Sequence, residues 1–182
     1  MPPISVTRTY LQLTSRDQLH PVPLDRRVRL ERAVGMTVPF FRFLYAEVGR
    51  RYHWRDRLAW SDEQCAARVG DPAVQFWVLY ADGVPAGYFE LERHADGAVE
   101  IVYFGLLPEF VGRSLGKQML SAAAEAAWKM DATRVWLHTC TLDNPAALPN
   151  YLKRGFAPFK TETYTVASAH PAAHVTDSPP PA

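Results

Sequence analysis

The sequence has no excess of either charge. Twenty Lys and Arg residues stand against nineteen Asp and Glu residues, so the formal net charge is +1 when the histidines are neutral. A chain without a basic excess has no long-range field that attracts nucleic acid or an anionic membrane surface. We therefore expect neither of these as a partner.

Cysteine is scarce, because Cys65 and Cys140 are the only two. They lie far apart in the sequence and lack the spacing of zinc ligands, so neither a disulfide framework nor a metal site is predicted. Cys140 alternates with His138 on one predicted strand. Two side chains make an incomplete metal site, which favours core packing for both.

Long apolar runs are missing as well. No segment reaches the roughly 18 apolar residues of a membrane span, and the first thirteen residues hold no apolar core of signal-peptide length. We expect a cytoplasmic protein with no membrane partner.

What the chain does contain is ordinary for a globular domain, with 48% hydrophobic and 21% charged residues. A length of 182 residues suits one domain, which we place at 1–166. The remaining segment, 167–182, is rich in proline and small residues, so we expect it to be disordered.

Hydrophobic periodicity and turn residues predict an order of strand, helices, three antiparallel strands, helix, strand, helix and strand. The corresponding ranges are 5–15, 40–54, 61–70, 73–81, 85–93, 98–107, 112–127, 133–140, 144–155 and 156–166. The three central strands are joined by Asp82-Gly83 and Asp96-Gly97, which are strong hairpin signals. This order predicts an α/β protein of the α+β type.

The run GRSLG at 112–116 can be read in two ways. It matches the G-x-S-x-G turn that presents the serine of a hydrolase, with Ser114 as the nucleophile. That turn requires a strand running directly into the serine, whereas Pro108 and Glu109 end the strand earlier, and His170 lies in the proline-rich tail. A serine hydrolase is therefore the weaker hypothesis.

The same run also fits a phosphate-binding turn at the start of a helix. Glycines allow the backbone to approach a ligand closely, and the N–H groups of the first helical turn point at it. Basic side chains beside the glycines add positive charge. The residues predicted to contact the ligand are Gly112, Arg113, Ser114, Leu115, Gly116 and Lys117.

At this point residues 74–166 resemble the GNAT superfamily of acyl-CoA-dependent N-acetyltransferases, most strongly in 99–120 and 144–156. The resemblance implies a mixed, mostly antiparallel sheet flanked by helices, with a splayed strand pair that holds acetyl-CoA as co-substrate. In the family's pyrophosphate loop, Val111 stands where Gln or Arg is usual and Ser114 where the first Gly is usual. A positive φ at Ser114 would strain it, and a negative φ would make its hydroxyl a phosphate donor.

The resemblance also implies where the rest of the coenzyme lies. The pantetheine arm is expected along the strand at Phe104 and Leu106. The spacing Asn144, Ala147, Tyr151, Gly155, Phe156 matches a family motif in which the tyrosine protonates the leaving thiolate. The alternative for Tyr151 is simple packing against the sheet, and Asn144 is expected to cap the helix or bind the coenzyme.

Acyl transfer also requires a neutral amine, and the resemblance suggests Glu100 as the general base, often through water. By strand alternation Glu100 shares a face with Val102 and Phe104. The alternative is a solvated or ion-paired carboxylate at the strand end.

The acceptor site is expected in the segment before the sheet. There Tyr52, Trp54 and Trp60 would form an aromatic wall that attracts an ammonium group, unless they belong to the core or a partner surface. Basic residues at 50–57 favour an acceptor with a carboxylate. We expect an N-acetyltransferase acting on a small, amino-acid-like primary amine; a non-catalytic acyl-CoA-binding module is the alternative, and a homodimer is compatible with either.

Overall fold

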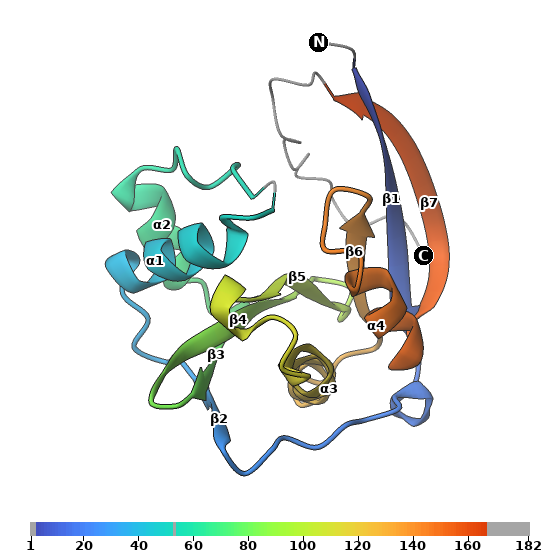
Figure 1. Ribbon diagram of the computed structural model, residues 1–182, viewed down its shortest axis with the longest axis horizontal. Helices are drawn as coiled ribbons and strands as arrows, with labels where there is room; N and C mark the ends of the chain where they lie inside the picture. The colour runs from blue at the N-terminus through green and yellow to red at the C-terminus, as the bar shows by residue number, and fades with distance from the viewer. Residues whose placement is uncertain (1–2, 53, 167–182) are drawn as a thin grey trace.

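The computed structural model describes residues 3–52 and 54–166, which form one seven-stranded sheet with helices on both faces (Figure 1). The strands are β1 Ile4–Leu13, β2 Val28–Arg32, β3 Val74–Ala81, β4 Val84–Arg93, β5 Val99–Leu106, β6 Val135–Cys140 and β7 Ala157–Val166. The helices are α1 Val38–Gly49, α2 Asp62–Val69, α3 Leu115–Trp128 and α4 Ala147–Lys153, with 3-10 turns at Arg16–Gln18 and Pro108–Phe110. The predicted disorder of 167–182 lies outside the described residues.

The predicted helix starts are confirmed by their capping interactions. The Thr37 side chain accepts a hydrogen bond from the Phe40 amide at the start of α1. Ser61 accepts from the Gln64 amide at the start of α2, and the Gln64 side chain accepts from the Ser61 amide in return. These side chains satisfy amides that have no partner within the helix.

The three central strands form the predicted antiparallel meander, β3 to β4 to β5. Asp82 and Gly83 both have positive φ values, 53° and 84°, as a two-residue hairpin turn requires. The sequence reading missed β2, which pairs with β3 at one edge of the sheet. Only five residues long and largely exposed, β2 has little hydrophobic alternation to reveal it.

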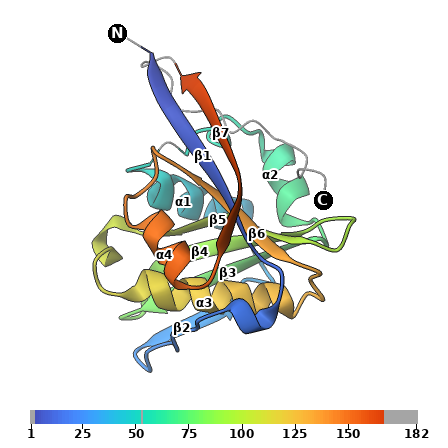
Figure 2. The same cartoon turned by 90° about the vertical axis from the view of Figure 1, so that its right-hand side faces the viewer.

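The N-terminal strand lies inside the sheet, in the order β2-β3-β4-β5-β6-β1-β7. It runs antiparallel to both of its neighbours, β6 and β7, so strands from the two ends of the chain lie side by side (Figures 1 and 2). In register, Arg8 lies opposite Cys140 on one side and opposite Glu162 on the other. This position brings β1 next to residues more than 130 positions away.

Two hydrophobic cores hold the layers together. One packs α3 and α4 against the sheet, and α3 contributes an alanine-rich buried face that includes Ala123, Ala124 and Ala127. The other packs α1 and α2 against the opposite face, with Phe41, Leu44 and Tyr45 of α1 among its members. The two faces of the central strands are therefore both covered by helices (Figure 2).

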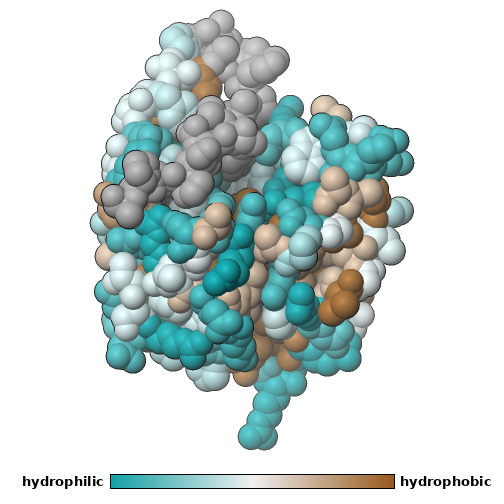
Figure 3. All heavy atoms as spheres, turned by 180° about the vertical axis from the view of Figure 1, so that it is seen from behind, coloured by the Kyte–Doolittle hydropathy of each residue, from teal (hydrophilic) through white to brown (hydrophobic). Residues whose placement is uncertain are grey.

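Seen from behind, the surface is mostly hydrophilic, and hydrophobic side chains occur in small scattered groups (Figure 3). Within residues 3–52 and 54–166, no helix has the length and apolar character needed to cross a lipid bilayer.

Candidate active site

A cavity opens where β5 and β6 separate. These parallel strands pair only at Val99 with Val135 and at Glu100 with Trp136. Beyond that point the sheet splits, and a cavity of about 650 Å³ is lined by residues 101–106 of β5. The loop before α3, the end of β6, α4, β1 and β7 supply the rest of its wall. The β5 backbone along this cavity has no strand partner on its β6 side among the described residues.

The loop before α3 forms one end of the cavity. Val111, Gly112, Ser114, Gly116 and Lys117 line it, as the phosphate-binding hypothesis requires. The first turn of α3, which begins at Leu115, directs its unpaired amides toward the same end. Four of the six residues that the sequence predicts to contact a phosphate therefore line this cavity, and Val111 lines it beside them.

Two residues of the predicted phosphate site point elsewhere. Leu115 is buried in the core that packs α3 against the sheet. Arg113 donates to Asp82 at 3.3 Å, and its guanidinium lies 4.8 Å from the centre of the Phe110 ring. Neither lines the cavity, because the helical turn rotates their side chains away from it.

Ser114 has a strained backbone conformation, because the turn imposes a positive φ on a residue that is not glycine. Its φ is 60° and its ψ is 13°, in the left-handed region, and its side chain makes no capping hydrogen bond. The condition for an added phosphate donor, a negative φ, is therefore not met. Gly112 also has a positive φ, 87°, and nothing lies within 4 Å of where its Cβ would be, so the glycine is needed for the turn alone.

Tyr151 projects from α4 into the middle of the cavity. It is 6% exposed, and its ring packs edge-on against Phe104 and Phe156, with both centroid distances 6.3 Å. Burial raises the pKa of Tyr151 well above its usual value, and the charge of Asp143 raises it further. The phenol therefore stays protonated at neutral pH and is available as a proton donor. Pro149 lies in the first turn of α4, where no amide hydrogen bond is lost.

Asn144 connects two walls of the cavity. Its side-chain amide donates to the Tyr52 hydroxyl at 3.0 Å, and its Oδ1 accepts from the Ala146 amide at 2.9 Å. Asn144 and Tyr52 both line the cavity. The loop after β6 is thereby fixed to the segment after α1, across the mouth of the split.

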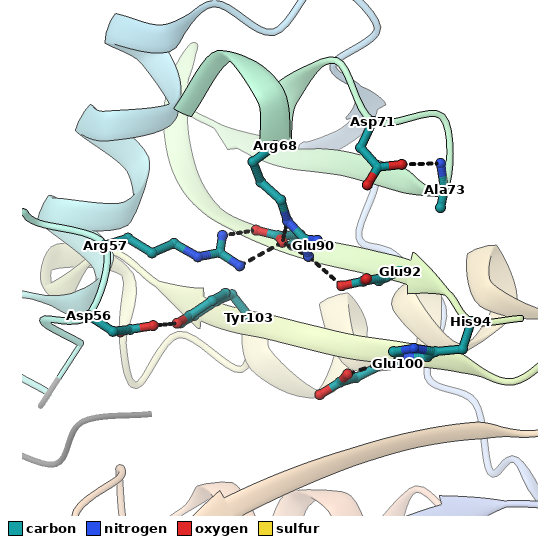
Figure 4. A network of polar contacts seen from close by, with 10 residues as sticks. All are labelled: Asp56, Arg57, Arg68, Asp71, Ala73, Glu90, Glu92, His94, Glu100 and Tyr103. Carbon is teal, nitrogen blue, oxygen red and sulfur yellow. Dashed lines mark hydrogen bonds and ion pairs between the residues drawn. The ribbon is translucent and has the colours of Figure 1, made fainter. Parts of the chain in front are cut away.

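Glu100 is not brought to the cavity. Its carboxylate lies 3.2 Å from Nε2 of His94, and Figure 4 shows the two side chains turned toward each other. Burial raises the pKa of Glu100, while the hydrogen bond from His94 lowers it. Of the two readings, the paired carboxylate is the one that this geometry supports.

A β-bulge in β5 explains why the simple alternation of side chains along the strand assigned Glu100, Val102 and Phe104 to the same face. Tyr103 pairs with Glu90 and Ile101 pairs with Leu91, which leaves Val102 without an opposite residue. The extra residue reverses the pattern of faces: Phe104 packs in the core of α3 and α4, whereas Val102 packs in the core of α1 and α2. The expectation that Glu100, Val102 and Phe104 share a face is therefore wrong.

The predicted aromatic wall is divided. Tyr52 and Trp54 line the cavity, but Trp60 does not. The Trp54 ring lies 4.8 Å from the Tyr103 ring, and Gly105 leaves room for it, since a Cβ there would come within 2.5 Å of Val48 and 3.4 Å of Trp54. Trp60 instead stacks near Phe41, at a centroid distance of 6.4 Å.

The basic residues at 50–57 do not face the cavity either. Arg57 is buried and donates to both Glu90 oxygens, at 2.6 and 3.0 Å (Figure 4). Arg50 pairs with Glu47 and Glu109 at the surface. None of the four arginines in this segment is a lining residue, and His53 lies outside the described residues. These arginines therefore give no support to a carboxylate-bearing acceptor.

The comparison with protein families decides what this arrangement is. The Acetyltransferase (GNAT) family profile matches residues 39–156. The chain belongs to this family.

Solved structures share the GNAT fold of this chain. A GCN5-related N-acetyltransferase from Kribbella flavida is 20% identical with a TM-score of 0.66, and the match covers 96% of this chain and 61% of that one. One from Sphaerobacter thermophilus is 16% identical with a TM-score of 0.66, covering 90% and 52%. A tandem GNAT protein from the clavulanic acid biosynthesis pathway is 18% identical with a TM-score of 0.65, covering 95% and 56%.

At these identities the likeness shows the fold alone, and the chain spans between 52% and 61% of the length of these three structures. The comparison with curated proteins found no match. The expected mixed, mostly antiparallel sheet flanked by helices is confirmed.

Sequence reasoning missed one wall of the cavity of this GNAT protein. Arg8, His138, Cys140, Asp143 and Tyr164 line it, from β1, from β6 and its following loop, and from β7. The core packing expected for His138 and Cys140 is thus corrected, although no group of three metal-binding side chains exists among the described residues. The signal that could have found Arg8 is its place on the buried face of β1, between Val6 and Tyr10.

Proposed function

We propose that the protein transfers an acetyl group from acetyl-CoA to a primary amine of a small acceptor. The observation that carries this proposal is a single cavity that joins the loop before α3, the unpaired edge of β5 and Tyr151. Its volume of about 650 Å³ lies within the usual range of small-molecule sites.

The coenzyme would be held mainly by backbone groups. The amides of the loop at 111–117 would bind the pyrophosphate, with Lys117 adding a positive charge. The pantetheine arm would run along β5 at Phe104 and Leu106, bonding to the edge that β6 leaves unpaired beyond Glu100. Val111 in place of Gln or Arg would not disturb this contact, because its own amide donates to the Pro108 carbonyl at 3.4 Å and the amides that follow it would bind the pyrophosphate.

The chemical step would be direct attack of the neutral amine on the thioester carbonyl. The new C–N bond forms as the C–S bond breaks, and the thiolate of coenzyme A leaves. Tyr151 would donate its proton to this thiolate, because burial keeps the phenol protonated within the cavity. The amine must lose one proton, and a base beside the cavity would take it.

The Tyr151→Phe variant tests the acid role. We expect turnover to fall by about 10²- to 10⁴-fold, the usual range for one general acid or base, while the Kd for acetyl-CoA stays nearly constant. Thiol release measures turnover and titration calorimetry measures binding. Tyr80→Phe is the control, because Tyr80 lies on β3 away from the cavity. Unchanged turnover in Tyr151→Phe would remove the phenol from the mechanism.

The base is assigned to His138 in this proposal. His138 lines the cavity, whereas Glu100 does not and would have to act through water. Histidine is also the side-chain type best suited to accept a proton near neutral pH.

A pair of variants separates the two bases. We expect His138→Gln to lower kcat by about 10²- to 10⁴-fold and to remove the rise of rate with pH. Glu100→Gln should keep the kcat of the wild type and its pH dependence. A pH–rate profile of thiol release for each variant is the measurement. The reverse result would transfer the base role to Glu100.

A non-catalytic acyl-CoA-binding module is the second candidate, and the strained φ of Ser114 is what favours it, since this residue stands at a family glycine. Acetyl-CoA binding without thiol release for any amine would establish it. A serine-directed phosphonate that labels Ser114 would instead indicate the hydrolase.

A further inference from the structure

Arg8 is a buried cation in the cavity wall. It lies on β1 between β6 and β7, and only 5% of its surface is exposed. It lines the same cavity as Tyr151, on the wall that also holds His138, Cys140 and Tyr164. A guanidinium is always charged, so this wall carries a buried positive charge.

The protein provides little to balance this charge. Nη1 donates to the Tyr10 hydroxyl at 3.4 Å and Nη2 to the Tyr164 hydroxyl at 3.5 Å, both long contacts. The guanidinium also lies 5.2 Å from the centre of the Tyr164 ring. Nε is buried without a hydrogen-bond partner, and no carboxylate of residues 3–52 or 54–166 forms an ion pair with Arg8.

The carboxylates nearest in the fold are already engaged. Glu162, opposite Arg8 in register, accepts from the Tyr10 hydroxyl at 2.9 Å and pairs with Lys160 at 2.6 Å. Asp143 accepts from the Thr139 hydroxyl at 2.7 Å and from the Cys140 amide at 2.8 Å. A buried charge is normally matched by an ionic partner, so the free partner position at Arg8 suits an anion from a ligand.

The other cationic side chains that line the cavity come from helices and not from the sheet. Lys117, Lys153 and Arg154 also line the cavity, but they belong to α3, α4 and the end of α4. Lys117 lies at the loop where the coenzyme phosphates would bind. Arg8 instead comes from the sheet, on β1.

We propose that Arg8 binds the carboxylate of the amine acceptor, which makes the acceptor an amino acid or a similar amino carboxylate. This inference rests on the proposed acetyl transfer. The planar guanidinium pairs with a carboxylate through two parallel hydrogen bonds.

The test compares ω-amino carboxylates with their carboxamides as acceptors, for example glycine, β-alanine and 4-aminobutyrate against the matching amides. Thiol release gives kcat/KM for each, and the acid-to-amide ratio is compared between variants, so that differences in amine basicity cancel. We expect Arg8→Gln to lower this ratio by about 10- to 100-fold, the effect of one hydrogen-bonded ion pair. Arg8→Lys should retain part of the preference, because the charge remains without the fork.

Arg134→Gln is the matched control. Arg134 directly precedes β6 and donates to Gln12 of β1 at 3.2 Å, but it does not line the cavity, so the acid-to-amide ratio of this variant should equal that of the wild type. A second readout is calorimetric binding of the N-acetylated product, which Arg8→Gln should weaken by the same factor of about 10 to 100. Thermal melting verifies that Arg8→Gln is folded. If this variant is unfolded, the acid-to-amide ratio of Arg8→Lys and the binding of the N-acetylated product to the wild type test the proposal instead.

The outcomes separate this inference from the function on which it rests. If wild type releases thiol with amides and carboxylates at equal kcat/KM, or if Arg8→Gln keeps the ratio, the acceptor carboxylate does not bind at Arg8 while acetyl transfer stands. If the wild type binds no acetyl-CoA, or releases no thiol with any amine, the proposed function itself fails and this inference fails with it.

Discussion

Two arginines among the described residues are buried, and their surroundings differ. Arg57 lies between α1 and α2 and donates to both oxygens of Glu90, which is completely buried and also accepts from Arg68 (Figure 4). The Arg57 guanidinium stacks over Tyr103 and Trp60, at 4.3 and 4.7 Å from the ring centres. Arg8 has two long contacts with tyrosine hydroxyls and no ionic partner within residues 3–52 and 54–166.

The difference separates a structural charge from a charge available to a ligand. Burial alone would raise the pKa of Glu90, but the charges of Arg57 and Arg68 outweigh it and hold that pKa below its usual value. The pair is thus ionised and mutually satisfied, and it ties the irregular segment after α1 to β4. Arg8 carries the same charge at similar burial, yet nothing in the fold uses it in this way.

The largest expected effect comes from breaking the satisfied pair. Glu90→Gln removes the negative charge and leaves Arg57 buried without compensation, so we expect a loss of about 3–5 kcal/mol in the free energy of unfolding. Urea denaturation at neutral pH measures it.

Glu92→Gln is the control on the same strand, because Glu92 pairs only with Arg68 and its side chain is 27% exposed. A partly exposed pair of this kind should cost about 1 kcal/mol or less. Equal losses in the free energy of unfolding of the two variants would mean that the burial of Glu90 does not increase its contribution to stability.

The smallest expected effect is on the stability of Arg8→Gln. Removing a desolvated charge that has no carboxylate partner should change the free energy of unfolding by less than about 1 kcal/mol, because the lost long hydrogen bonds are offset by the relief of desolvation. The same denaturation experiment gives the value. A loss as large as that of Glu90→Gln would contradict the comparison and make Arg8 a structural residue like Arg57.

Much of the fold was predictable because its signals are local. The Asp82-Gly83 turn acts through neighbouring residues, and the structure confirms it. The helix starts at Thr37 and Ser61 likewise depend on residues only three positions away. The short edge strand β2 has too few buried positions to produce a periodic pattern, so it was missed.

The candidate site was predictable where it depends on one continuous segment. Tyr151 lines the cavity, and so do the residues of the loop at 111–117 other than Arg113 and Leu115. Prediction failed where a side chain depends on pairing with another strand: the bulge at Val102 separates Glu100 from Phe104, and the pairing of Arg57 with Glu90 takes the expected carboxylate-binding charge away from the cavity.

The sequence by itself determined the helix caps, the hairpin turns, the glycine-bearing loop before α3 and the spacing around Tyr151, because each is specified by residues close together in the chain. Only the tertiary structure decided that β1 lies between β6 and β7, that these strands bring Arg8 to the wall of the cavity, and that β5 and β6 separate beyond Glu100. The physical reason is that strand order and register follow from packing between distant segments, and no local pattern records which strand an edge will accept.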